Sequence, residues 1–277
     1  MEMLGSAEPK RPDDGGGGGD DRLSALPDDL LRAILSSLKA QQTVQTCVLS
    51  TRWRHLWRTV PCLDIGRGYA IHRIDDFTAN LLRGHDFTIL EDLRLHGATV
   101  VVGDRWLRGD IGRDAWPHRL KRLHLSGLDL ELNDLASHIS SSGCPALEEV
   151  ELQQCWFFLS GNTKIASSSL KTLVINGNYT DTADEDDVSD EVFRLIIDAP
   201  ALVVLRLGGE ANHIIDTTQP HNMPSLIDAS IKLCCFDSMN HHLGILGALS
   251  NVTTLYLSHL DVTLLLDESH SCVSSSI

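Results

Sequence analysis

Apolar residues recur at helical spacing near the start of the chain and at strand spacing over most of the rest. In the first stretch they fall three and four positions apart, at Leu30, Leu31, Ile34, Leu35 and Leu38. This spacing predicts an amphipathic helix with a wide apolar stripe. Pro27 suits the start of that helix, and the acidic residues at 28 and 29 favour the positive end of the helix dipole.

Two further helical patterns follow a polar break. The second has a short apolar set at Val44, Val48 and Leu49. The third covers residues 51–60, where Trp53 and Trp57 are four positions apart on one face, and Pro61 ends it. We therefore expect a small three-helix unit over residues 22–62. It carries more apolar surface than so short a unit can bury, and its spacing leaves open whether that surface is a core or a docking face.

An internal repeat begins at residue 90 and follows the pattern L-x-x-L-x-L-x-x-N/C-x-L. Residues 147–157 fit it throughout, with Cys155 at the N/C position. Successive repeats start 23 to 32 residues apart, at Leu90, Leu120, Leu147, Leu170, Leu202, Leu226 and Val252. Each repeat is expected to supply one short strand whose inward leucines stack on those of its neighbours. This pattern predicts a leucine-rich-repeat solenoid.

The patterns divide the chain into five segments and predict an α/β fold. We expect a disordered leader over residues 1–21, the three-helix unit over 22–62 and a strand-and-helix link over 63–89. The solenoid, with about seven irregular repeats, covers 90–265, and 266–277 is expected to fray. Within these segments, residues 62–65 fit a strand, and residues 74–82, 132–139 and 192–197 fit helices.

Composition narrows the classes of function. The net charge of −15 argues against binding to nucleic acid or to an anionic membrane, and no run approaches the about 18 apolar residues of a membrane span. Seven cysteines without a C-x-x-C pair indicate buried thiols in a reducing compartment. Without a secretory signal pattern, we expect the protein in the cytoplasm, the nucleus or both.

The sequence holds no pattern for catalysis or for a cofactor. Neither a nucleotide-binding G-x-x-x-x-G-K loop nor a G-x-S-x-G elbow occurs. Cys234, Cys235, His241 and His242 are residue types that bind zinc. However, adjacent residues of a strand point to opposite faces, so Cys234 and Cys235 cannot easily bind one metal ion. We therefore predict no catalytic residue, no metal site and no cofactor.

Two polar features are open to more than one interpretation. The first is the set of strand positions beside the leucines, which line either a ligand-binding face or a solvated surface: Arg94, His96, His124, Glu149, Glu151, Arg206 and His259. The second is the insertion at residues 181–191, with seven acids in eleven residues. It attracts a basic partner over a distance, or it is simply a solvated loop.

Residues 23–57 resemble the F-box. The family pattern runs L-P-D-E-L-L, I-L-S and V-x-T-x-V-L-S-x-R-W-R-x-L-W, and this chain reads LPDDLL at 26–31, ILS at 34–36 and VQTCVLSTRWRHLW at 44–57. Two positions depart from it, because Lys39 replaces a usual proline and Gln45 a common arginine. Together with the repeats, the chain resembles the plant F-box/leucine-rich-repeat family.

The resemblance implies a non-catalytic, substrate-recognition subunit of a Skp–cullin–F-box ubiquitin ligase. The F-box would bind the Skp adaptor, and through it a cullin, with Leu26, Pro27, Leu30, Ile34, Leu35, Val44, Val48, Leu49 and Trp53. The repeats would bind a protein substrate that the sequence does not identify. The alternative is a leucine-rich-repeat scaffold, a truncated receptor included, without ligase function.

Overall fold

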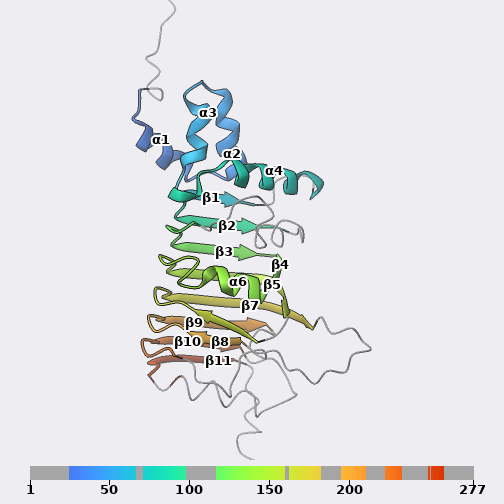
Figure 1. Cartoon of the computed structure of the whole chain (residues 1–277), viewed down its shortest axis with the longest axis vertical. Coiled ribbons are helices and arrows are strands. Elements are labelled where there is room, and N and C mark those ends of the chain that lie inside the picture. Colours follow the sequence, from blue (N-terminus) through green and yellow to red (C-terminus); the bar gives the residue numbers. More distant parts are fainter. Residues whose placement is uncertain are drawn as a thin grey trace, which may run out of the picture.

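The computed structural model describes residues 25–66, 71–97, 117–159, 162–181, 195–209, 222–232, 249 and 251–258. Helices gather at the N-terminal end, and the strands below them stack one under another along the long axis of the molecule (Figure 1). Several predictions fall outside the described residues: the leader, nearly all of the acidic insertion, His259, the Cys234–Cys235 pair with its histidines, and the tail.

The N-terminal unit consists of short helices separated by tight turns. Its elements are α1 (Asp28–Leu35), α2 (Ala40–Gln45), the 3-10 helix η1 (Thr46–Val48), α3 (Trp53–Leu56) and the 3-10 helix η2 (Trp57–Thr59). The predicted third helix is therefore divided, because its last turn tightens into 3-10 geometry, as helix ends often do. Among the described residues, no helix is long and apolar enough to cross a membrane.

The strands form a parallel sheet that runs through the described part of the chain. Its order is β1 (Cys62–Ile65), β2 (Asp92–His96), β3 (Arg122–Ser126), β5 (Glu149–Leu159), β7 (Thr172–Asp181), β9 (Val204–Gly209), β10 (Asp228–Lys232) and β11 (Thr254–Ser258). The seven strands after β1 each begin two residues after a predicted repeat start. The prediction of helices followed by a solenoid of mixed α/β class is confirmed.

The remaining elements lie between these strands. They are α4 (Ile71–Gly84), the 3-10 helix η3 (Phe87–Ile89), β4 (Asp129–Glu131), α6 (Leu132–Ile139), β6 (Thr163–Ala166) and β8 (Leu195–Asp198). The helix predicted over 132–139 is observed with the same bounds. The helix predicted over 192–197 is wrong, because its described part is strand β8, which pairs in parallel with β6. Its short apolar run is too brief for periodicity to separate a helix from a strand.

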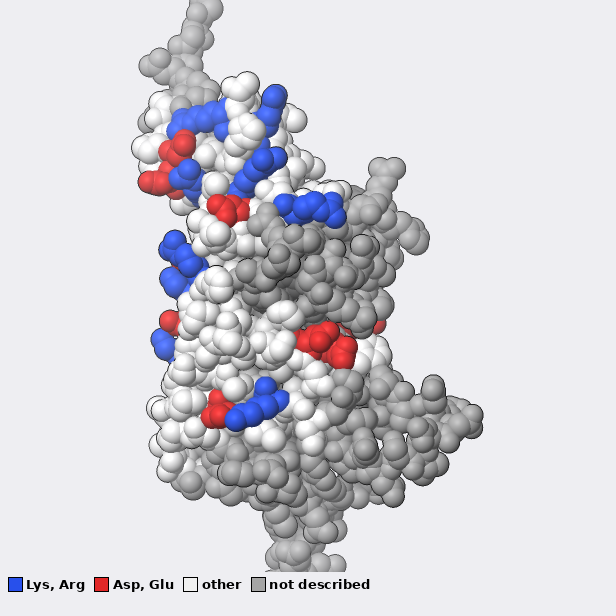
Figure 2. Space-filling model, in the orientation of Figure 1, with Lys and Arg blue, Asp and Glu red and all other residues white. Residues whose placement is uncertain are grey.

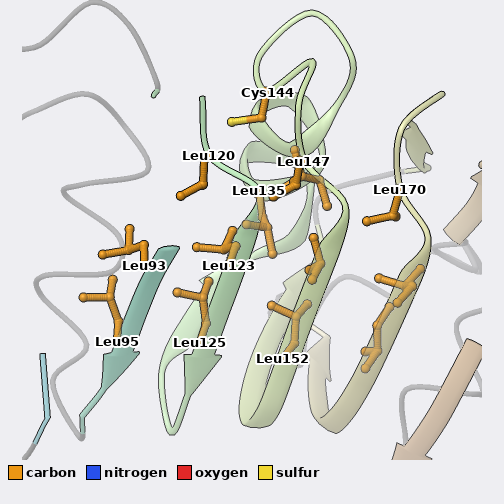
Figure 3. Packing of buried hydrophobic residues seen from close by; sticks show 14 of the residues in the cluster. Leu93, Leu95, Leu120, Leu123, Leu125, Leu135, Cys144, Leu147, Leu152 and Leu170 are labelled. Atoms are coloured by element: carbon orange, nitrogen blue, oxygen red, sulfur yellow. The ribbon is translucent and has the colours of Figure 1, made fainter. Parts of the chain in front are cut away.

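Stacked leucines form the core of the sheet. Leu93 faces Leu123 and Leu95 faces Leu125 in the parallel register (Figure 3). The same two rows continue through β5, β7, β9 and β10. The cluster of buried residues also contains Leu31 and Trp53 of the N-terminal unit. Because β1 already pairs with β2, the sheet begins inside the segment interpreted as a link, and the helices share its core.

A β-bulge between Gln153 and Cys155 shifts the register of β5 against β7. Beyond it, Cys155 pairs with Gly177, whose missing side chain lets the two backbones come close. A Cβ at Gly177 would lie 2.1 Å from the carbonyl oxygen of Cys155. The glycine is therefore required by contact with the neighbouring repeat.

We expect Leu173→Ala to lower the free energy of unfolding by about 2–5 kcal/mol, because it leaves a cavity in the stacked core. Leu255→Ala removes the same side chain from the same repeat position, but Leu255 is 43% exposed whereas Leu173 is 0% exposed. The decrease in the free energy of unfolding should therefore be clearly smaller for Leu255→Ala than for Leu173→Ala. Urea unfolding of the two variants measures the difference, and equal losses would contradict a shared, buried leucine row.

We also expect Gly177→Ala to destabilise the protein, because the backbone of the adjoining strand must shift to admit the methyl group. Gly66→Ala is the matched control, since the atoms nearest to its added Cβ are 3.8 Å and 3.9 Å away. Thermal unfolding should show a lower midpoint for the first variant and little change for the second.

Candidate partner-binding surfaces

The N-terminal helices expose a group of large apolar side chains. Leu30 and Ile34 on α1 are 52% and 40% exposed, and Val48 and Leu49 at the end of η1 are 87% and 61% exposed. Leu31 and Leu35 of the same helix are buried, since each lies about 100° further round the helix than the exposed residue before it. We call Leu30, Ile34, Val48 and Leu49 the exposed apolar set.

The structure divides the nine residues predicted to contact the adaptor. Beyond the exposed apolar set, Pro27 is exposed and Leu26 and Val44 are partly buried against the core. The inclusion of Leu35 and Trp53 needs correction for this chain, because they are 0% and 3% exposed. Leu35 supports α1 from inside, because the apolar repeat of α1 fills two sides of that helix, and Trp53 supports α3 in the same core.

Arg52 ties the start of α1 to the start of α3. Its guanidinium donates from Nε to Asp28 Oδ1 at 2.8 Å and from Nη2 to the carbonyl oxygen of Leu26 at 2.6 Å. One turn further along α1, Arg32 donates from Nη1 to Asp29 Oδ1 at 2.8 Å and from Nε to Thr59 Oγ1 at 3.0 Å. Such exposed pairs contribute little singly, but together they fix α1 against the segment that carries Val48 and Leu49.

Basic side chains surround these helices. Over residues 22–62 the sequence has six basic and two acidic residues within a chain of net charge −15. Figure 2 shows several Lys and Arg side chains over the helical end of the molecule. Arg54 is exposed, and Arg58 lies over the ring of Trp57 with 5.5 Å between Cζ and the ring centroid. The exposed apolar set thus lies within a locally positive unit.

On the face of the sheet, Asp92 is a buried carboxylate held by two arginines. Arg94 Nη2 lies 3.0 Å and Arg122 Nε 2.9 Å from its Oδ2, while the Asp92 side chain is almost fully buried. Hydrogen bonds to Asp92 raise the pKa of the Arg94 guanidinium. Because both arginines turn toward Asp92, this part of the face carries a net positive charge.

The next strands carry the opposite charge. His124 lies with its Nδ1 3.1 Å from Glu151 Oε2 and its Nε2 3.9 Å from Glu149 Oε1. One ligand atom from each of these three residues lies within 4.8 Å of the others, which is compact enough for a metal ion. The pairing of imidazole with carboxylates accounts for the cluster without an ion, so it does not by itself indicate a metal site.

The other predicted strand-face residues are less closely joined. His96 Nδ1 is 2.8 Å from Ser126 Oγ and its Nε2 is 3.6 Å from Asp64, while burial lowers the pKa of its imidazole. Arg206 lies farther along the sheet, 3.9 Å from Asp228. The structure therefore unites His124 with Glu149 and Glu151, but it leaves Arg206 apart from them.

Sequence reasoning missed several members of this network. Asp92 and Arg122 begin their strands, two positions before Arg94 and His124, and therefore point to the same face. Lys39 reaches Asp64 of β1 at 2.7 Å and so joins the helices to the sheet by an ion pair. The alternation of inward and outward residues in each repeat could have placed Asp92 and Arg122 on this face. No sequence pattern indicates that Lys39 pairs with Asp64.

Cysteines near the repeats are structural. Burial raises the pKa of Cys144 to about 12 and that of Cys155 to about 11. Cys155 Sγ lies 3.6 Å from the carbonyl oxygen of Leu125 in the preceding repeat. Both thiols are therefore protonated at neutral pH, and Cys155 links neighbouring turns at the N/C position.

Comparison with known proteins agrees with this arrangement. The model of the F-box domain matches residues 23–64. The meiotic F-box protein MOF of Oryza sativa subsp. japonica is 30% identical over 315 aligned residues, which cover 89% of this chain and 62% of that protein. An F-box/FBD/LRR-repeat protein of Arabidopsis thaliana is 26% identical, over 86% of this chain and 63% of that protein.

This chain thus spans somewhat less than two thirds of the length of these relatives. A second F-box/FBD/LRR-repeat protein of Arabidopsis thaliana is 32% identical over 41% of this chain and 24% of its own length. No solved structure gives a significant match. The chain thus has an F-box domain followed by parallel repeat strands, and over most of its length it is similar to F-box proteins of plants.

Proposed function

We propose that this protein is a substrate-recognition subunit of a Skp–cullin–F-box ubiquitin ligase. The observation that carries the proposal is the exposed apolar set on the F-box helices. Elsewhere in this unit apolar side chains such as Leu31, Leu35 and Leu56 are buried. An exposed group of this size on short amphipathic helices favours a partner that covers it, and the F-box match favours a Skp-type adaptor.

In this proposal the repeats present a second surface to a protein substrate. The strand face carries Arg94, Arg122, Glu149 and Glu151 at its outward positions, with side chains partly open to solvent. The subunit performs no chemistry. It raises the local concentration of a substrate lysine near the ubiquitin-charged enzyme, because one chain holds both the adaptor and the substrate.

The proposed adaptor surface is smaller than the set implied by the family resemblance. Its centre is the exposed apolar set, and Pro27 and Leu26 border it at the start of α1. Leu35 and Trp53 act indirectly, because they fix the helices on which that set lies. Arg52 is a further positioning residue, since it bonds to both Asp28 and the Leu26 carbonyl.

We expect Leu30→Asp to abolish capture of a Skp-type adaptor in a pull-down while the chain stays folded. A charge at the centre of an apolar interface must be desolvated without a partner, which costs several kcal/mol. Ile227→Asp is the matched control: Ile227 is 50% exposed, as Leu30 is at 52%, but it lies in the repeats. The proposal fails if the unchanged chain does not retain the adaptor, or if both variants lose it equally.

Trp53→Ala should act through stability. Removal of an indole that is 3% exposed is expected to lower the free energy of unfolding by about 3–5 kcal/mol. Adaptor capture should then fall together with the folded fraction, as followed by circular dichroism over a urea series. Full stability with lost capture would instead place Trp53 in the interface.

Cellular lifetimes separate a receptor from a scaffold without ligase function. Proximity labelling with the Leu30→Asp variant should collect substrates that are no longer degraded. If their lifetimes are the same with and without the unchanged protein, the scaffold is the better description.

A further inference from the structure

Acidic and aromatic side chains face each other across two neighbouring strands of the repeats. Strand β4 pairs in parallel with the end of β5, so that Asp129 lies opposite Trp156 and Glu131 opposite Phe158. Residues opposite each other on adjacent strands are about 5 Å apart and share a face of the sheet. We call these four residues the acid–aromatic patch. None of them belongs to the strand-face set predicted from the repeats.

The bulge in β5 gives Trp156 its outward direction. Gln154 adopts the left-handed backbone conformation, with φ of 54°, which is uncommon for a residue other than glycine. One extra residue is thereby inserted, and the alternation restarts with Cys155 and Phe157 buried. Trp156 is 47% exposed as a result, whereas Trp53 is in the core.

The carboxylate beside this indole has no counter-charge among the residues that the structure describes. Asp129 is partly buried and forms no ion pair with any described residue. The Asp129 carboxylate therefore gives the surface beside Trp156 a local negative charge.

We propose that the acid–aromatic patch binds a lysine- or arginine-bearing segment of a partner protein. A guanidinium or ammonium group lies over the Trp156 indole and donates to the Asp129 carboxylate, so that one cation satisfies both. The inference rests on the proposed function in one respect, because it names the class of substrate that the repeats recognise.

The test uses the full chain and a fluorescein-labelled hexa-arginine peptide, followed by fluorescence anisotropy at about 0.15 M ionic strength. Trp156→Ala and Asp129→Asn should each raise Kd by about twofold to thirtyfold, the range expected for loss of a cation–aromatic or charge-assisted contact. Trp156→Phe keeps an aromatic face and should stay closer to the unchanged chain. Glu148→Gln removes the same charge as Asp129→Asn roughly 25 Å away along β5 and should change Kd little.

Two results would overturn the proposal. If Trp156→Ala, Asp129→Asn and Glu148→Gln all bind the peptide as the unchanged chain does, the attraction is general to an acidic protein. If Trp156→Ala weakens binding but Asp129→Asn does not, the patch is an apolar contact and not a cation site. Capture of the Skp-type adaptor is measured on the same preparations. If a variant loses the peptide but still captures the adaptor, the defect lies in the patch. If the unchanged chain does not capture the adaptor, the proposed ligase function is wrong, and the peptide result is judged separately.

Discussion

Each repeat strand removes its leucines from water only by packing against the strands before and after it. Leu93, Leu123 and Leu173 lie in one such row, and each is completely buried between neighbours. The constraint explains why the sheet is parallel, why its register is kept over so many turns and why a glycine is required where the strands approach most closely, at Gly177. It also fixes the outward positions, because every second residue must leave the core.

The helical unit depends on the same core at its upper end. Leu31, Leu35 and Trp53 join the buried cluster that continues into β1 and β2, and Lys39 adds an ion pair to Asp64 of β1. Once these side chains are inside, the helical repeat leaves Leu30 and Ile34 outside. A stable scaffold and an exposed apolar surface thus arise from one amphipathic helix, which is what a docking module requires.

Charge is arranged differently at the two candidate surfaces. The F-box helices are basic within an acidic chain, whereas β4 and the end of β5 place carboxylates beside exposed aromatic rings. Between them the strand face carries ion-paired groups of opposite net charge, since Asp92 takes two arginines and His124 lies between two glutamates. Locally paired charges attract partners weakly, because each is already satisfied. The surfaces best suited to partners are therefore those where apolar or aromatic groups remain uncovered.

The sequence by itself determined the repeat, the position of its strands, a first helix starting near Pro27, the helix at 132–139 and the F-box resemblance, because local periodicity carries that information. It did not determine which side of α1 is covered: Leu30 and Leu35 both belong to one apolar pattern, and only packing against α3 and the sheet separated them. It also misread the strand at 195–198, whose conformation depends on pairing with distant β6. The acid–aromatic patch likewise needed the tertiary structure, since a single bulged residue decides that Trp156 faces outward and parallel pairing decides that Asp129 lies beside it.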